Sequence, residues 1–176
     1  MRTFIVITAI GSDRVGIADD ISQEVLRWNC NIEEGKMSVL GGEFAAILLI
    51  SGQEGKADEL LADLESFGQA IGLQVEGRKT FEQKVPSDAR PYVIRSVSLD
   101  TPGIVKAITG VVREEGISIE EAETSTRGAP FSGAPMFHME LRVLIPAGVS
   151  VKALRHTLDQ LADERDLDVS VESLGA

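Results

Sequence analysis

The sequence contains, at residues 11–17, the stretch Gly11-Ser12-Asp13-Arg14-Val15-Gly16-Ile17, and a related stretch, Ser98-Leu99-Asp100-Thr101-Pro102-Gly103-Ile104, follows it 87 positions later. The neighbouring residues repeat as well, because residues 5–34 slide onto residues 92–121 without a gap. The identical pairs are Val6/Val93, Ile7/Ile94, Asp13/Asp100, Gly16/Gly103, Ile17/Ile104, Ile21/Ile108, Val25/Val112, Ile32/Ile119, Glu33/Glu120 and Glu34/Glu121. Ten identities in thirty positions are well above chance, so the chain is a tandem repeat.

Each copy of this stretch is predicted to be a turn from a strand into a helix. An apolar run, residues 4–10, enters the first copy, and a pattern with helical spacing leaves it. The first N–H groups of a helix lack internal partners and lie at the positive end of its dipole, which suits a carboxylate ligand. Gly16 and Gly103 would let a ligand or another backbone approach closely.

Ordinary helix-start chemistry explains the same residues. Asp100 or Thr101 would be the N-cap and Pro102 the first helical residue. Gly103 would then serve tight packing. The residues alone leave both interpretations open, a ligand-binding turn and a plain helix start.

Length and composition favour two folded domains. The chain has 176 residues with the repeat at its midpoint, and 43% of them are hydrophobic, which is enough for packed cores. We predict a first domain at residues 1–80, a linker at 81–90 and a second domain at 91–176. The linker segment is polar, contains Pro86 and shows no periodicity.

The charge of the chain argues against direct binding of nucleic acid. The net charge is −11, with 28 acidic and 17 basic residues, and the basic residues are scattered. Phosphate neutralisation needs clustered Lys and Arg, so proteins and small molecules are the expected partners.

The sequence predicts a cytoplasmic protein without a membrane contact, metal or cofactor. The apolar run near the N-terminus is shorter than that of a signal peptide, and no run reaches membrane-spanning length. Cys30 is the single cysteine and is expected to be a buried small apolar residue. His138 and His156 are isolated from any ligand cluster, and no Ser/His/Asp set or glycine-rich phosphate loop is present, so we expect no enzyme.

The first half is predicted to have the element order βαββαβ. Strand 3–11 is apolar on both faces, which indicates a central strand or one covered twice. The other expected elements are a helix over 15–28 with Ile17, Ile21, Val25 and Trp28 on its buried side, strands 32–40 and 43–51 joined by a hairpin turn at Gly41-Gly42, a helix with Leu60, Leu64 and Phe67, and a strand at 73–77. This order is typical of the α+β ferredoxin-like fold, with both helices on one face of a four-stranded antiparallel sheet and right-handed crossovers.

The second half repeats this order. Its expected elements are strand 92–99, a helix with Ile104, Ile108, Val111 and Val112, strands from Ser118 and from Met136, a helix with Leu154, Leu158 and Leu161, and a strand from Leu167. A Gly/Pro-rich loop, residues 127–135, replaces the short turn of the first half and carries Phe131; it is either a contact or lid, or a neutral insertion. Alternation in the following strand places His138, Glu140 and Arg142 on the face away from the helices.

The two halves resemble the amino-acid-binding ACT domains. These have a βαββαβ unit, the motif Asp-x-Pro-Gly-Ile at the first turn and Asn-Ile at the start of the second strand. The chain has Asp13-Arg14-Val15-Gly16-Ile17 with Asn31-Ile32, and Asp100-Thr101-Pro102-Gly103-Ile104 with Ser118-Ile119. Two such units in tandem, with Asn29-Cys30-Asn31-Ile32, residues 37–44 and the approach 133–137, resemble the glycine cleavage system transcriptional repressor family in particular.

This resemblance implies a regulator that senses a small amino acid, with glycine suspected, and acts by contacting a DNA-binding transcription factor. The candidate ligand-binding residues are Gly11, Ser12, Asp13, Arg14, Val15, Gly16, Ile17, Asn31, Ile32, Asp100, Thr101, Pro102, Gly103, Ile104 and Ser118. Because Leu99 and Ser118 replace Ser12 and Asn31, the first half is expected to contribute more polar contacts. Such units are expected to pair with one another, either within one chain or between two chains, and the second arrangement would be a homodimer.

Two other functions compete with this one. An accessory subunit of a biosynthetic enzyme that responds to an amino acid also fits a pair of ACT units. An acylphosphatase-like hydrolase would share the fold and would use Arg14 with Asn31, but Asp13 places a negative charge where a phosphate would lie.

Overall fold

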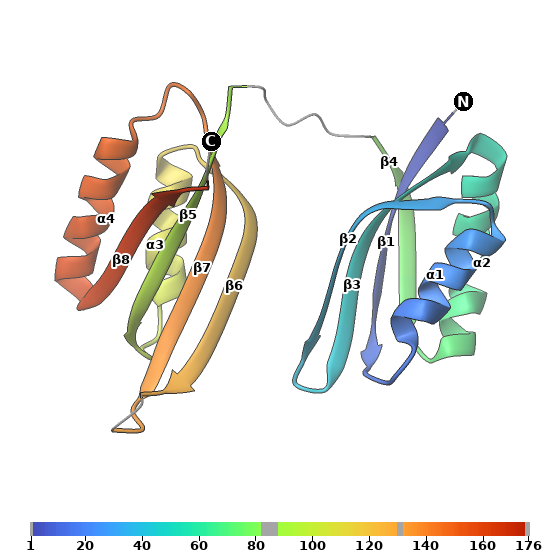
Figure 1. Ribbon diagram of the computed structural model, residues 1–176, viewed down its shortest axis with the longest axis horizontal. Coiled ribbons are helices and arrows are strands. Elements are labelled where there is room, and N and C mark those ends of the chain that lie inside the picture. The colour runs from blue at the N-terminus through green and yellow to red at the C-terminus, as the bar shows by residue number, and fades with distance from the viewer. Residues whose placement is uncertain (1, 82–87, 130–131, 175–176) are drawn as a thin grey trace. The chain divides into compact units, whose positions relative to one another are not determined.

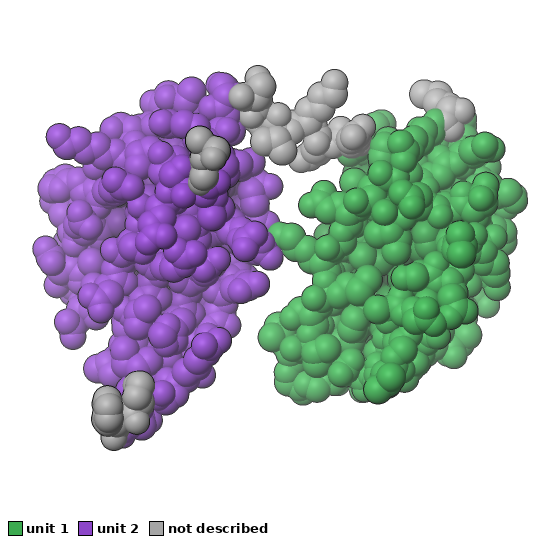
Figure 2. Space-filling model, in the orientation of Figure 1, with its two compact units in different colours: residues 1–84 green, residues 85–176 purple. Residues whose placement is uncertain are grey.

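The computed structural model describes residues 2–81, 88–129 and 132–174, and the chain divides into two compact units, residues 1–84 and 85–176 (Figure 2). Unit 1 comprises β1 (Arg2–Ser12), α1 (Ile17–Arg27), β2 (Asn31–Leu40), β3 (Glu43–Gln53), α2 (Glu54–Ile71) and β4 (Gln74–Thr80). Unit 2 comprises β5 (Arg90–Leu99), α3 (Ile104–Glu114), β6 (Ser118–Gly128), β7 (Pro135–Ile145), α4 (Val151–Arg165) and β8 (Leu167–Ser173).

The two units have the same topology. The strand order is β2-β3-β1-β4 in unit 1 and β6-β7-β5-β8 in unit 2, and every pairing is antiparallel. In each unit both helices lie on one face of the sheet (Figure 1). The predicted α+β class, with two ferredoxin-like βαββαβ units, is confirmed.

The core of unit 1 is formed by apolar residues that alternate along the strands and recur at helical spacing along the helices. Ile5, Ile7 and Ala9 alternate along β1, face the helices and are buried. Ile21 and Val25 supply the matching face of α1. Burial of such side chains stabilises the fold by roughly 1.5–3 kcal/mol each. β1 is central, as predicted, but its other face is not covered within the unit, and Ile10 is half exposed there.

The hairpin turn was predicted correctly. Gly41 and Gly42 both have positive φ, 62° and 86°, and Leu40 pairs with Glu43, as a primed two-residue turn requires. The corresponding connection of unit 2 runs from Gly128 to Pro135. Residues 130–131 lie outside the described residues, so the contact or lid at Phe131 stays a prediction, and most of the predicted linker, residues 82–87, lies outside them too.

Both helix starts differ from the predicted capping chemistry. α1 begins at Ile17 rather than Val15, and the N-cap residues are Gly16 and Gly103, neither with a side-chain cap. Asp100 and Thr101 are therefore not N-caps, and Pro102 precedes α3. The two glycines have φ of 94° and 96°, a region that residues with a Cβ atom rarely occupy.

Three further predictions about side chains are confirmed. Cys30 is buried, and burial raises the pKa of its thiol. Trp28 packs against the core and donates a hydrogen bond from Nε1 to Glu24 Oε1 at 2.8 Å. In β7, Met139 and its alternating neighbours are buried, whereas Arg142 lies on the other face and is exposed.

We predict that Ser96→Ala stabilises unit 2. Within the described residues, the Oγ atoms of Ser96 and Ser98 are buried without a hydrogen-bond partner, and alanine, Ala9, occupies the repeat position of Ser96 in unit 1. Removing an unsatisfied hydroxyl should raise the free energy of unfolding by about 1 kcal/mol, measured by urea denaturation. Ser170→Ala, on exposed β8 sequence, is the control and should change it little; a loss of stability in Ser96→Ala would show that its hydroxyl has a partner.

Candidate functional site

The first predicted turn connects β1 to α1 and presents backbone amides. The first helical hydrogen bond runs from the Asp20 amide to the Gly16 carbonyl at 2.9 Å, so the amides of Ile17, Ala18 and Asp19 come before it. The Ile17 side chain is buried in the core, and the Val15 side chain is 99% exposed. Only backbone groups of these residues could therefore contact a polar ligand.

Two polar side chains of this turn, those of Arg14 and Ser12, already have protein partners. Arg14 Nη2 forms an ion pair with Asp20 Oδ2 at 2.5 Å and also donates to the Ile71 carbonyl at 3.3 Å. Ser12 Oγ donates to Glu43 Oε1 at 3.3 Å. Asp19 and Asp20 lie in the first turn of α1, where negative charge interacts with the helix dipole and opposes a further anion.

Other members of the candidate set at this turn have local structural roles. The Asp13 amide donates to the Gly42 carbonyl at 2.9 Å, which ties the turn to the hairpin. A Cβ on Gly11 would lie 2.7 Å from Leu73 Cδ2, so glycine permits close packing between β1 and the α2–β4 connection.

The second predicted turn is less acidic than the first. Gly103 accepts the Ala107 amide at 3.0 Å, and α3 has no acidic residue in its first turn but carries Lys106 there. The Asp100 amide donates to the Pro135 carbonyl at 3.0 Å, and Thr126 Oγ1 donates to Asp100 Oδ2 at 3.4 Å. The local charge therefore favours binding of an anion at the second turn over the first. The expectation that the first half contributes more polar contacts to a ligand stays a prediction.

The structure does not bring Asn31 and Ile32 to the first turn of their own unit. β1 and β2 both run antiparallel to β3, with Ser12 opposite Glu43 and Asn31 opposite Ser51. Positions 43 and 51 are eight residues apart along β3, which corresponds to about 27 Å. The prediction that Asn31 and the helix-start amides form one site is therefore wrong within a single unit.

Unit 2 shows the same separation. Ser118, the first residue of β6, lies opposite Leu144, whereas Leu99, at the turn end of β5, lies opposite Met136. Ser118 Oγ donates to Glu120 Oε1 at 3.1 Å and is exposed. The motif residues of each unit thus divide between the two ends of its sheet.

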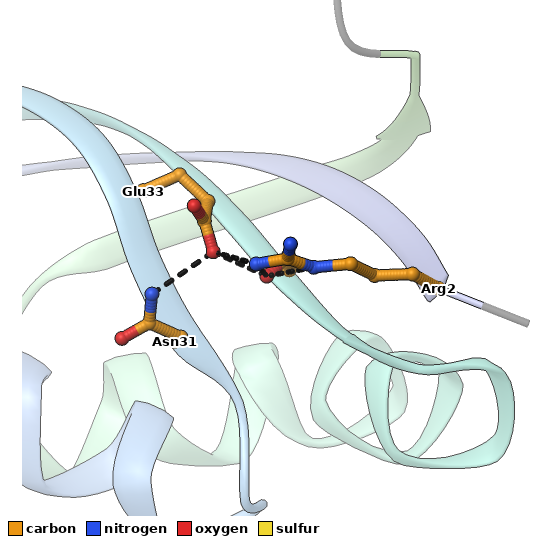
Figure 3. Close-up of polar contacts among 4 residues, drawn as sticks. Arg2, Asn31 and Glu33 are labelled. Carbon is orange, nitrogen blue, oxygen red and sulfur yellow. Dashed lines mark hydrogen bonds and ion pairs between the residues drawn. The ribbon is translucent and has the colours of Figure 1, made fainter.

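A polar cluster surrounds Asn31 at its end of the sheet. Glu33 Oε1 accepts hydrogen bonds from Ser51 Oγ at 2.5 Å and from Asn31 Nδ2 at 2.9 Å, and it forms an ion pair with Arg2 Nη2 (Figure 3). Arg2 Nη2 also donates to Ser51 Oγ at 2.8 Å. Ser51 is buried, whereas Arg2 is exposed. The hydrogen bond from Ser51, then that from Asn31 and the charge of Arg2, lower the pKa of the Glu33 carboxyl.

A β-bulge in β2 creates this cluster. The β2–β3 register shifts between Ile32 and Glu34, so Glu33 is an extra residue without a direct partner on β3. Its carboxylate thereby lies beside Arg2, the first residue of β1, as Figure 3 shows, and accepts the hydrogen bond from Ser51.

Only part of the cluster is repeated in unit 2. A register shift recurs between Ile119 and Glu121, at the repeat position of the first bulge. However, Leu144 occupies the position of Ser51 opposite the first residue of the strand, and Ala89 occupies the repeat position of Arg2. The arginine–glutamate–serine arrangement is specific to unit 1.

A pocket of about 790 Å³ lies beside the cluster. Arg2, Asn31 and Ser51 line it together with Gly52, Glu54 and Gly55, so the N-terminus of α2 forms one wall. Sequence reasoning missed Arg2, Glu33 and Ser51 as site residues. A comparison of the two repeats could have pointed to these residues. Glu33 is the same in both repeats, whereas the positions of Arg2 and Ser51 hold other residues in the second repeat.

Unit 2 has a smaller hollow on the sheet face away from its helices. Its volume is about 290 Å³, and His138, Arg127 and Glu123 contribute to its lining. On the same face Arg95 forms ion pairs with Glu140 at 2.9 Å and with Glu172 at 2.7 Å. These cross-strand pairs are exposed, as expected for a solvated sheet face.

We predict that Ser51→Ala raises the pKa of Glu33 toward its ordinary value, because the hydrogen bond from Ser51 is the largest cause of its lowering. A carboxyl whose folded pKa is lowered stabilises the native state above its unfolded pKa, and that stabilisation is lost as the pH falls through the folded pKa. NMR titration of the Glu33 carboxyl measures the change. Ser118→Ala, at the start of β6, should leave the Glu33 titration as it is; an unchanged pKa in Ser51→Ala would contradict the contact.

The part of the chain that the structure describes has no helix long and apolar enough to cross a membrane and no group of three or more potential metal ligands. A family model described as ACT domain matches residues 3–77, most of unit 1. Unit 1 therefore matches the ACT domain family. Unit 2 repeats the same topology, so the protein is a tandem arrangement of two ferredoxin-like units, the first of which matches the ACT domain.

Similarity to individual proteins extends through both units. The chain is 28% identical over 169 residues to the glycine cleavage system transcriptional repressor of Escherichia coli (strain K12), a match that covers 96% of this chain and 88% of that protein. A crystal structure of an unknown protein from Galdieria sulphuraria is 32% identical, with a TM-score of 0.87, and the match covers 99% of this chain and 100% of that one. A candidate glycine cleavage system transcriptional repressor of known structure shares the fold, with 23% identity, a TM-score of 0.77 and coverage of 100% and 99%.

Proposed function

We propose that this ACT protein is a regulator that senses a small amino acid, with glycine as the favoured ligand, and acts by contacting a DNA-binding transcription factor of the glycine cleavage system. The observation that carries the proposal is the similarity to the Escherichia coli repressor across both units rather than across one ACT domain. Similarity that includes the connection and both sheets supports a shared use of the tandem arrangement.

The helix-start turns are the proposed contacts for the ligand carboxylate. The amides that precede the first helical bonds of α1 and α3 can donate to an anion. Asn31 and Ser118 lie at the other ends of their sheets, so neither joins the helix-start turn of its own unit. A second unit is therefore proposed to complete the site, and a homodimer is one way to supply it.

The proposed route to DNA is indirect. The net charge of −11 repels a phosphate backbone, and protein–DNA affinity depends on the phosphates that Lys and Arg neutralise. We predict that the pure chain shows no specific affinity for a promoter fragment at physiological salt, measured by fluorescence anisotropy. Saturable binding of the fragment without a partner protein would contradict the prediction.

The experiment that tests the sensing function is a thermal-shift screen against the twenty standard amino acids. A ligand that binds only the native state stabilises it by about 2.7 kcal/mol at one hundred times its Kd. We expect a response to glycine or another small amino acid. If none of the twenty shifts the unfolding temperature, the chain does not sense a free amino acid.

Two rival functions make different predictions. A regulatory subunit of a biosynthetic enzyme would respond to an amino acid in the same screen but would co-purify with the enzyme rather than with a transcription factor. An acylphosphatase-like hydrolase would need Arg14 close to Asn31, yet Arg14 pairs with Asp20 at the turn and Asn31 lies at the opposite end of the sheet. An assay of acyl-phosphate hydrolysis separates this last function from the others.

A further inference from the structure

Unit 1 has an apolar surface on the face of its sheet that its own helices leave uncovered. Side chains alternate along β1 and β3, so one set faces the helices and the other set faces away from them. Two of the outward residues, Ile10 and Ile47, are 53% and 50% exposed. A contiguous apolar patch on a sheet face is typical of an interaction surface. The outward set consists of Phe4, Val6, Thr8 and Ile10 on β1 and of Ala45, Ile47 and Leu49 on β3.

Unit 2 shows that the fold does not require these apolar residues. Thr8 and Ile47 are cross-strand partners in unit 1. Arg95 and Glu140 hold the same two positions in unit 2, where they form an ion pair at 2.9 Å. The two units have the same strand order, and both have an apolar core on the helix side of the sheet. The apolar character of the outward face in unit 1 therefore has a cause other than folding of the unit.

Charged residues lie at both edges of this face. One row of residues across the sheet runs from Glu34 on β2 to Arg78 on β4. The two middle residues of the row, Leu49 and Val6, are apolar. Glu34 and Arg78 are exposed, and within the described residues neither side chain forms a hydrogen bond or an ion pair. The row therefore has a negative end, an apolar middle and a positive end.

The next row has the reverse order of charge, because it runs from Lys36 on β2 to Glu76 on β4. A two-fold axis along the strands, between β1 and β3, would turn each row end for end over itself. Glu34 would then face the partner subunit's Arg78, and Lys36 would face the partner subunit's Glu76. A two-fold axis across the strands, between the two rows, would also bring opposite charges together. The face is thus complementary to itself, as a symmetric dimer requires.

The face is also large enough for a dimer. Its strands are seven to eleven residues long, about 24–37 Å, and the four of them span about 19 Å. The flat area is therefore about 450–700 Å², before the relief of the side chains is added. A specific interface buries about 600–1,000 Å² on each partner. Two sheets packed face to face stand about 10 Å apart, which the long side chains at the edges can bridge.

We propose that the uncovered sheet face of unit 1 binds the same face of a second copy of the chain, and that this contact forms a symmetric dimer without any amino acid. The outward residues of β1 and β3 make the apolar centre of the interface, and the charged ends of the two rows surround it. The inference goes beyond the proposed sensing function and does not depend on it.

The test is sedimentation equilibrium of the full chain without amino acids, and the measured quantity is the dissociation constant of the dimer. Thr8→Arg/Ile47→Glu introduces the ion pair that unit 2 carries at the same positions, so unit 1 should fold with a charged face. Glu34→Arg reverses one exposed charge at the edge. Leu26→Glu, at a 72% exposed position of α1, is the control for the loss of an exposed apolar side chain. Urea unfolding shows whether each variant is folded.

We expect the wild type to be a dimer and Leu26→Glu to have the same dissociation constant. The double variant should raise this constant about a hundredfold, because charged groups would lose water in the interface. Glu34→Arg should raise it about tenfold, because the new arginine would face a positive charge under either axis.

A wild-type chain that is monomeric at every concentration tested would overturn the inference. A wild-type dissociation constant in the folded double variant would also overturn it, because the copies would then associate through another surface. Glu34→Arg changes only an exposed side chain and should fold, so it decides the question in the same way if the double variant is unfolded.

Discussion

Gly68→Ala is expected to lower the free energy of unfolding by about 2–3 kcal/mol, because added volume at a tightly packed site forces the backbone to move. Gly68 is buried on α2, and a Cβ built on it would lie 2.7 Å from the Leu73 carbonyl oxygen and 3.2 Å from the Val75 amide nitrogen. Both contacts are with backbone atoms of the turn and strand that follow the helix. Because these atoms belong to the backbone, they cannot move aside as a flexible side chain would, so α2 and β4 must move apart.

The matched control is Gly110→Ala in α3. Gly110 is also a helical glycine, but a Cβ on it would meet nothing within 4 Å. Alanine should therefore stabilise that helix by about 0.5–1 kcal/mol through its higher helix propensity. Urea unfolding of the two variants measures the difference. Equal effects of the two substitutions would contradict the close approach of α2 to β4.

The fold could be predicted from the sequence because its signals are local and occur twice. The spacing of Ile17, Ile21 and Val25 indicates an amphipathic helix without knowledge of any distant contact, and all three are buried as this spacing requires. Gly41-Gly42 indicates a hairpin in the same way. Recurrence of the helical spacing 87 positions later, at Ile104, Ile108 and Val112, makes an accidental match improbable.

The polar cluster could not be predicted, because it depends on long-range register. Arg2 and Ser51 are 49 positions apart and meet only through the pairing of β1 with β3, and Glu33 reaches them only through a bulge that no residue of β2 specifies. The same register separates Asn31 from the first turn. The motif brings these residues close in the sequence, whereas the parallel direction of β1 and β2 places them at opposite ends of the sheet.

The role of Gly16 also differs from the one expected at the turn. The sequence suggested that this glycine leaves room for a ligand or another backbone to approach. In the structure the nearest atom to a Cβ on Gly16 is Arg14 Nη1, at 3.9 Å, so space is not limiting. The φ of 94° is what requires glycine, because a Cβ atom is strained in that conformation.

Gly16→Val is therefore expected to lower the free energy of unfolding by about 2–3 kcal/mol, since a β-branched residue at this φ is strained or must shift the start of α1. Gly103→Val, with φ of 96° at the start of α3, should have a similar effect. Gly16→Asn is the informative companion, because asparagine tolerates positive φ better and should cost roughly 1 kcal/mol. Urea unfolding gives the three values. If Gly16→Val unfolds at the same urea concentration as the wild type, the backbone of the turn is free to relax and the strain argument is wrong. A loss of amino-acid response in that variant would then mean that the valine side chain blocks ligand binding, because the helix start is intact.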